Sequence, residues 1–165
     1  MNGMRVWGLA PVLLLLSVTR AMAGGTVTTG TCKKASNIDF AVATDGLDNT
    51  TSLSFVDVPD MSVDFVAKGN DGCALVEYSA STFADAGNVV YVRALLDGTT
   101  VCAPDALQLS GDDDENGDGK WSRSHAFNFV CTGLIAGDHN IKIQWMGFTG
   151  GVIYVHQRSL FVHHK

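Results

Sequence analysis

From residue 36 onward, hydrophobic and polar residues alternate with a period of two along most of the chain. In the segment 140–146, Ile141, Ile143 and Trp145 fall on one side of an extended chain, and the residues between them are polar. The segments 61–68 and 121–131 repeat this pattern. Alternation of this kind, interrupted by Gly, Asp, Asn and Pro, is typical of short antiparallel strands with one buried and one solvated face.

The alternating segments predict about ten short strands, separated by turn-forming pairs such as Asp45-Gly46 and Asp97-Gly98. This spacing predicts an all-β fold in which two antiparallel sheets pack as a sandwich. The segment 88–96 is apolar on both sides except at Arg93, which indicates a central strand covered on both faces. The segment 82–86 is also compatible with a turn of helix. We expect strands at residues 38–44, 52–58, 62–68, 74–81, 88–96, 106–110, 121–131, 140–146, 152–157 and 160–164.

The first 23 residues have the three zones of a cleavable signal peptide. Arg5 lies in a short polar start, an apolar run covers residues 9–18, and Ala21-Met22-Ala23 precedes two glycines. The apolar run is shorter than the roughly 20 residues that a membrane-spanning helix needs, so no stable membrane anchor is expected. We therefore expect a signal peptide at 1–23 and a single β-sandwich domain at 24–165, secreted to an extracellular or periplasmic space.

All four cysteines, at positions 32, 73, 102 and 131, lie in the part that is expected to be exported. An even number of cysteines in a secreted chain indicates disulfides, and four cysteines allow three connectivities. Pairing of Cys32 with Cys73 and of Cys102 with Cys131 is favoured, because each pair joins neighbouring segments. No two of these cysteines have the close spacing of a structural zinc site.

The charge balance argues against binding of nucleic acid. Cleavage after Ala23 would remove Arg5 and Arg20 but no acid, leaving 9 basic against 17 acidic side chains and a net charge of −8. The remaining Lys and Arg residues are scattered along the chain, whereas binding to phosphates requires clustered cations.

An acidic run at 111–119 interrupts the alternation of apolar and polar residues and is a candidate calcium site. Side-chain oxygens recur there at alternate positions around a glycine, the arrangement that a calcium loop uses. The run resembles the first half of an EF-hand or thrombospondin type 3 loop, but Arg123 occupies the place of the bidentate Glu. The alternative is a solvated hairpin loop whose charge protects a strand edge. The expected ligands of a structural Ca²⁺ are Asp112, Asp114, Asn116 and Asp118.

Trp121, Arg123 and His125 alternate on one predicted face next to the acidic run, and they are the candidate ligand-binding residues. A flat indole ring such as that of Trp121 can stack on the apolar face of a sugar. His125 is alternatively a rim histidine with no ligand. Trp145, which alternates with two isoleucines, is expected in the core. Asn49-Thr50-Thr51 fits the acceptor pattern for N-glycosylation.

The sequence contains no recognised catalytic motif. It has no GxSxG nucleophile elbow and no HExxH metal motif, and the expected disulfides remove a thiol nucleophile. A secreted hydrolase, whose carboxylates meet only in the folded chain, remains an alternative to a binding protein. We expect no enzyme.

The segments 91–98 (YVRALLDG) and 134–145 (LIAGDHNIKIQW) resemble paired strands of secreted bacterial β-sandwich proteins. A strand that ends in Asp97-Gly98 and another opened by Ala136-Gly137 and His139 are similar to those of jelly-roll modules, including carbohydrate-binding and C1q-like ones. The resemblance implies a jelly-roll sandwich that acts as a non-catalytic binding or adhesion module for a glycan or another cell-surface ligand. The C1q-like alternative implies a homotrimeric structural or assembly protein.

Overall fold

The computed structural model describes residues 31–32, 36–44, 46–70, 72–85, 87–111 and 123–165, and every regular element in these ranges is a β-strand. All described residues belong to one compact unit, Thr31–Lys165. Among the described residues there is no helix long and apolar enough to cross a membrane. The strands are β1 (Asn37–Ala43), β2 (Asp48–Thr50), β3 (Val56–Ala67), β4 (Gly72–Ala84), β5 (Val89–Leu96), β6 (Thr100–Val101), β7 (Leu107–Gly111), β8 (Arg123–Leu134), β9 (Gly137–Gly147) and β10 (Ile153–His164).

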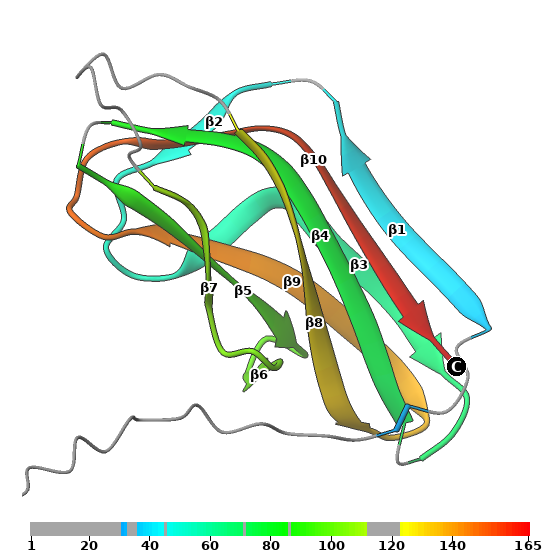
Figure 1. Ribbon diagram of the computed structural model, residues 1–165. Coiled ribbons are helices and arrows are strands. Elements are labelled where there is room, and N and C mark those ends of the chain that lie inside the picture. Colours follow the sequence, from blue (N-terminus) through cyan, green and yellow to red (C-terminus); the bar gives the residue numbers. More distant parts are fainter. Residues whose placement is uncertain (1–30, 33–35, 45, 71, 86, 112–122) are drawn as a thin grey trace, which may run out of the picture. The chain divides into compact units, whose positions relative to one another are not determined.

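The strands form two antiparallel sheets of five strands each that pack as a sandwich (Figure 1). In the first sheet, called sheet A, the order is β1-β10-β4-β8, and β2 pairs with the other end of β10. In the second, called sheet B, the order is β3-β9-β5-β6, and β7 also pairs with β5. Consecutive long strands alternate between the sheets, which gives the jelly-roll type of sandwich that the sequence predicts.

The alternation in the sequence places one set of side chains between the sheets. In β9, Ile141 and Ile143 are fully buried and Trp145 is 1% exposed, as their spacing predicts. Phe65 of β3 and Phe129 of β8 belong to the same core. Because a strand turns successive side chains to opposite faces, the residues between these positions lie on the outer faces of the sheets.

Several strands differ from the expected ones. The segment 82–86 does not form a turn of helix, because β4 continues through Ala84 and pairs with both β8 and β10. The expected strands 52–58 and 62–68 contribute to one strand, β3, whose pairing with β9 shifts between Asp57 and Ser62. The last two expected strands are likewise one strand, β10, which is interrupted by a bulge between Val155 and Arg158. Strand β5 is central, but Tyr91 and Arg93 on its outer face are only half-buried, so the expectation of cover on both faces is wrong.

Two disulfides have the favoured connectivity. Cys32 bonds to Cys73 and ties the start of the described chain to β4. Cys102 bonds to Cys131 and joins the segment that follows β6 of sheet B to β8 of sheet A. Next to the second bond, the backbone groups of Ala103 and Val130 exchange hydrogen bonds of 2.9 and 2.7 Å. The second disulfide therefore fastens the two sheets together at one edge.

Candidate functional site

The sequence-predicted ligand-binding residues lie at the end of sheet A that leads into the acidic run. Trp121 lies outside the described residues. Arg123 and His125 stand opposite Thr82 and Ala80 of β4, both buried, so they occupy the inner side of the sheet. Arg123 is exposed, and the ring of His125 lies 6.3 Å from that of Phe127 at 15°. The alternation of Arg123 and His125 on one face agrees with the sequence analysis, and their role in binding stays a prediction.

The predicted calcium ligands Asp112, Asp114, Asn116 and Asp118 all lie outside the described residues. Among the residues that are described, no group of three or more His, Cys, Asp or Glu side chains is arranged to hold a metal ion. The calcium expectation therefore concerns the acidic run alone.

A row of polar side chains that the sequence analysis did not single out crosses the outer face of sheet B. Asp57 of β3, Gln144 of β9 and Arg93 of β5 are successive cross-strand neighbours. Lys142 lies two residues before Gln144, on the same face of β9, and also donates a hydrogen bond to Asp57. These four residues are called the Arg93 row.

Hydrogen bonds hold the Arg93 row in one arrangement. The Arg93 guanidinium donates to Gln144 Oε1 from Nε at 3.0 Å and from Nη2 at 2.7 Å. Gln144 Nε2 donates to Asp57 Oδ1 at 2.8 Å, and Lys142 Nζ lies 3.2 Å from Asp57 Oδ2. The guanidinium carbon also lies 4.2 Å from the centre of the Phe55 ring, within the range of a cation–π contact.

The Arg93 row is mixed in charge, with two cations and one carboxylate. The hydrogen bond from Gln144 lowers the pKa of Asp57 below its ordinary value, and Lys142 acts in the same direction against the effect of burial. Asp57 is therefore ionised at neutral pH.

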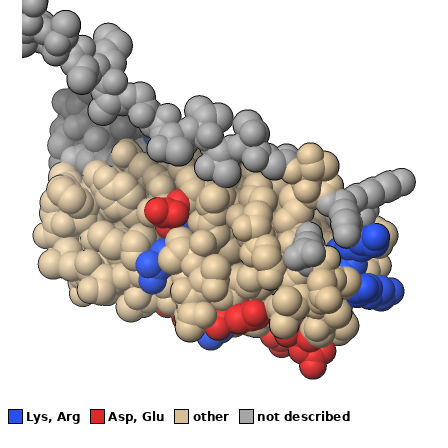
Figure 2. Space-filling model, turned by 90° about the horizontal axis from the view of Figure 1, so that it is seen from below, with Lys and Arg blue, Asp and Glu red and all other residues tan. Residues whose placement is uncertain are grey.

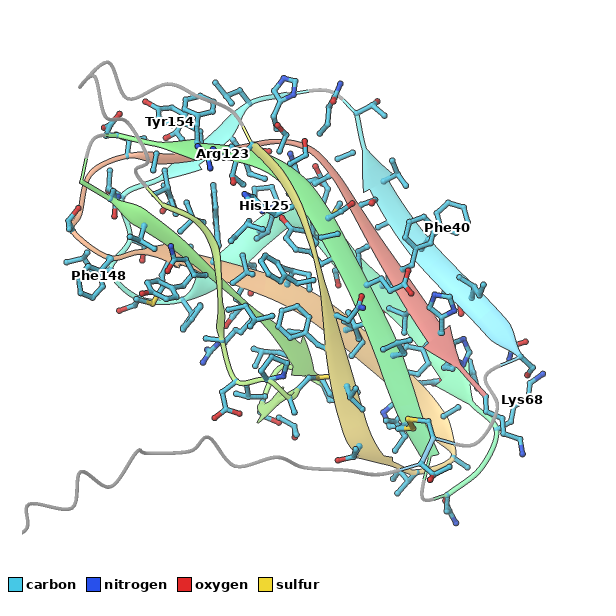
Figure 3. All side chains as sticks on the ribbon, in the orientation of Figure 1. Phe40, Lys68, Arg123, His125, Phe148 and Tyr154 are labelled. Carbon is cyan, nitrogen blue, oxygen red and sulfur yellow. A yellow bond between two sulfur atoms is a disulfide. The ribbon has the colours of Figure 1, made fainter. Side chains whose placement is uncertain are left out.

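Aromatic and apolar side chains continue the same face toward the loop between β9 and β10. Met146 and Tyr91 are cross-strand neighbours in the next row, and Gln108 of β7 follows Tyr91. The rings of Tyr91 and Phe148 are 6.3 Å apart, and Phe148 is 64% exposed. Figure 3 shows Phe148 projecting away from the body of the sandwich.

The position of Phe148 is set by a fully buried asparagine. Asn88 Oδ1 accepts hydrogen bonds from the backbone N–H groups of Phe148 and Thr149 at 2.8 and 3.0 Å. Its Nδ2 donates to the Gly151 carbonyl at 2.7 Å. One side chain thus holds both ends of the β9–β10 loop, so Phe148 is exposed on a fixed backbone.

At the opposite end of sheet B there is an acidic depression of about 500 Å³. His139 is one of its lining residues, with Nδ1 2.8 Å from Asp97 Oδ2 and Nε2 2.8 Å from the Ile135 carbonyl oxygen. Both partners are acceptors, so the doubly protonated imidazolium satisfies both bonds. The lining residues are Asp64, Phe65, Val66, Asp97, Asp138, His139 and Asn140.

The electrostatics of this depression agree with its hydrogen bonds. Burial acts to lower the pKa of His139, but the Ile135 carbonyl, Asp97 and the charge of Asp138 raise it above its ordinary value. Burial acts to raise the pKa of Asp97, and the backbone N–H of Asn140 together with His139 brings it below its ordinary value. The depression therefore contains a charged His–Asp pair in weakly acidic solution.

The face of the molecule that Figure 2 presents carries few concentrated charges. Figure 2 shows acidic and basic side chains in small separate groups on a surface that is otherwise uncharged, within the part of the chain that the figure colours. In the Arg93 row, by contrast, charged groups from three strands are connected by hydrogen bonds.

Comparisons with known proteins give likenesses of fold at low identity. No family model and no curated protein sequence matches the chain. A solved structure of infectious bursal disease virus, Gx strain, matches 86% of the chain at 15% identity and a TM-score of 0.48, and the chain spans 35% of that protein. Eiger TNF from S. frugiperda matches 78% of the chain at 10% identity and a TM-score of 0.44, with 92% of that protein covered.

A third solved structure is the C-terminal CBM6 of LamC, a marine laminarinase from Zobellia galactanivorans. It matches 75% of the chain at 14% identity and a TM-score of 0.37, with 98% of that domain covered. These likenesses concern the arrangement of strands and do not identify a ligand. The topology and the face of sheet B define the chain as a jelly-roll β-sandwich domain with a preorganised polar and aromatic surface.

Proposed function

We propose that the protein is a secreted, non-catalytic binding module that recognises a carbohydrate on the outer face of sheet B. The observation that carries the proposal is the Arg93 row, which is fixed by hydrogen bonds and continues into the half-buried ring of Tyr91 and the exposed ring of Phe148. The two disulfides are compatible with an oxidising, extracellular location.

The chemistry of the face suits a sugar. A pyranose presents apolar C–H groups on its faces and hydroxyl groups around its edge. Tyr91 and Phe148 offer rings for the apolar side, while Arg93 and Gln144 offer planar groups for neighbouring hydroxyls. Because these polar groups are already held in place, binding costs less conformational entropy than it would for free side chains.

A glycan array followed by titration calorimetry with the best ligand tests the proposal. We expect Arg93→Ala and Phe148→Ala each to weaken binding at least tenfold, about 1.4 kcal/mol. Tyr154→Ala is the matched control, because Tyr154 is a half-buried aromatic residue on the outer face of sheet A, stacked on Phe83 at 4.4 Å. The affinity of Tyr154→Ala for the glycan should equal that of the wild type.

Three results would contradict this assignment. Absence of binding to any glycan would refute the carbohydrate ligand. Loss of binding in Trp121→Ala or Arg123→Ala, with Arg93→Ala unaffected, would move the site to the end of sheet A that the sequence analysis favoured. Chemical turnover of the glycan that is lost in Asp97→Asn would show a hydrolase, contrary to a non-catalytic role.

We also propose that the acidic run binds a structural Ca²⁺, on the strength of its alternating carboxylates. A cation that binds only the folded state raises the melting temperature by mass action. We expect a higher melting temperature in millimolar Ca²⁺ than in chelator, and we expect Asp114→Ala to melt like the chelated wild type. Equal melting of the wild type in both conditions would overturn the calcium site.

A further inference from the structure

The outer face of sheet A is apolar along its edge strand β1. Ile38, Phe40 and Val42 alternate along this strand and are 55%, 64% and 54% exposed. Phe40 contacts Phe161 of β10 with ring centres 5.8 Å apart, so the apolar surface extends onto the neighbouring strand. Figure 3 shows the Phe40 side chain directed away from the sandwich.

The same strand forms the edge of sheet A. Along its whole length β1 pairs with β10, and within the described residues no strand pairs with its other side (Figure 1). Such an edge presents unpaired backbone N–H and C=O groups to another strand. The segment 37–43 contains neither Lys nor Pro, the residues that commonly block edge pairing.

The charged residue of β1 already has a partner within its own sheet. Asp39 Oδ2 lies 2.6 Å from His164 Nε2. On the neighbouring surface, Glu77 Oε1 lies 3.6 Å from His163 Nε2. Each of these two carboxylates therefore has a polar partner within its own chain.

We propose that a second copy of this chain pairs with β1 in antiparallel orientation, about a two-fold axis at Phe40. This symmetry places Phe40 opposite its copy and Ile38 opposite Val42 of the partner, so that apolar residues meet along the strand. On the other face it places Asp39 opposite Ala41 rather than opposite another acid. The strand is thus complementary to itself, as a two-fold interface requires.

The palindromic pattern favours a second copy over an unrelated peptide. Positions 38 and 42 are both apolar and lie at equal distances from position 40. This symmetry brings apolar residues opposite one another when the partner strand has the same sequence, and it has no such effect for an unrelated strand. Pairing also joins the two A sheets into one continuous sheet, and it removes both exposed edges at once. Sheet B takes no part in this contact, so the inference does not depend on the carbohydrate site.

Sedimentation of the secreted protein over a concentration series tests the interface. We expect a reversible monomer–dimer equilibrium, and we expect Phe40→Lys to weaken dimerisation at least tenfold. Ile135→Lys is the matched control, because Ile135 is an exposed apolar residue, at 63%, in the turn between β8 and β9. A monomer at all concentrations, a trimer, or a dimer that Phe40→Lys leaves unchanged would overturn the proposal.

Disulfide trapping tests the register. Opposite residues of an antiparallel pair have Cα atoms about 4.5 to 5.5 Å apart, which suits a disulfide. Phe40→Cys should therefore form a covalent dimer on mild oxidation, whereas Ile38→Cys should not, because its partner position is Val42. The double variant Ile38→Cys/Val42→Cys should crosslink again. Equal crosslinking of Phe40→Cys, Ile38→Cys and the control Ile135→Cys would contradict this pairing.

Discussion

Arg158 lies in the core region of the sandwich although it is a charged residue, with only 3% of its surface exposed. The bulge in β10 adds one residue between Val155 and Arg158, and this turns Arg158 inward. There its Nε donates to the Pro59 carbonyl at 3.0 Å, and its Nη2 donates to Asp48 Oδ2 at 2.5 Å. The guanidinium thereby joins β10 to the chain around β2 and to the irregular part of β3.

Replacing Arg158 should destabilise the fold strongly. We expect Arg158→Met to lower the free energy of unfolding by about 3 kcal/mol, because it leaves a carboxylate and a carbonyl without their partner. Lys142→Met is the control, since its ion pair with Asp57 is solvent-exposed and should contribute less than about 1 kcal/mol. Denaturant titration measures both, and equal losses would show that burial of Arg158 has no special effect.

The pair of His139 and Asp97 predicts a pH-dependent stability. The pKa of His139 is raised from 6.5, so protonated His139 stabilises the fold fully below pH 6.5, and this contribution disappears as pH rises through the folded-state value. The pKa of Asp97 is lowered from 3.8, so its contribution is present above pH 3.8 and is lost as pH falls through the folded-state value. The pair is most stabilising between these limits.

Asp97→Asn tests this pH dependence, because an Asn side chain keeps an acceptor for the Asn140 N–H but removes the charge. Melting temperatures should differ more between wild type and variant at pH 5 than at pH 8. A difference that is the same at both pH values would mean that the charge of the pair does not contribute.

At the scale of elements, the loop between β9 and β10 depends on Asn88. We expect Asn88→Ala to lower the free energy of unfolding by about 2 kcal/mol, because it leaves the partly buried N–H groups of Val89 and Thr149 without an acceptor. The same variant should weaken glycan binding through displacement of Phe148. The control is Asn70→Ala, since Asn70 is exposed and accepts one bond, from the Ala136 N–H. Hydrogen exchange at Thr149 should accelerate only in Asn88→Ala.

The Cys102–Cys131 disulfide joins the sheets, and its sulfur atoms belong to the core. Both cysteines are almost fully buried, at 2% and 1% exposure. Removing a disulfide that closes a loop of this length should lower the free energy of unfolding by about 4 kcal/mol, because the unfolded chain becomes less constrained. We expect Cys102→Ala/Cys131→Ala to lose more stability than Cys32→Ala/Cys73→Ala, because Cys32 is exposed and its removal leaves less unfilled core volume. Denaturant titration of the two double variants compares them directly, and the opposite order would refute this reasoning.

The sequence predicted the strands because most of them have one buried and one solvated face, and period-two alternation records this difference directly. It did not predict the bulge at Arg158, because a single added residue reverses the alternation without changing the composition of the strand. It also missed β2 and β6, which are too short, at 3 and 2 residues, to show a period. The continuation of β4 through Ala84 depends on pairing with β8 and β10, which lie far away in the sequence.

The Arg93 row illustrates why the candidate site was harder to predict than the fold. Its members come from three strands, and Asp57, Arg93 and Gln144 become neighbours only through the registers of β3, β9 and β5. The sequence offered one signal, an arginine within an otherwise apolar strand. It could not supply the partners of this arginine, because strand order in a sandwich is not encoded in local alternation.

At the scale of the whole molecule, the two proposed surfaces belong to different sheets and can act together. A dimer joined through β1 carries two copies of the outer face of sheet B, and neither copy takes part in the dimer contact. Two linked sites on one particle bind a dense surface far more tightly than a single site, by factors of 10² to 10⁴ where the geometry permits both to engage.

This arrangement predicts a difference between soluble and surface-bound ligands. Phe40→Lys should bind a soluble oligosaccharide with the affinity of the wild type, because Phe40 lies on sheet A. On a surface densely coated with the same glycan, it should bind at least tenfold more weakly than the dimeric wild type, and Ile135→Lys should match the wild type in both assays. Surface plasmon resonance at high and low glycan density measures the effect, and the advantage of the wild type should disappear at low density. An equal loss of soluble binding in Phe40→Lys would instead place the carbohydrate site on sheet A.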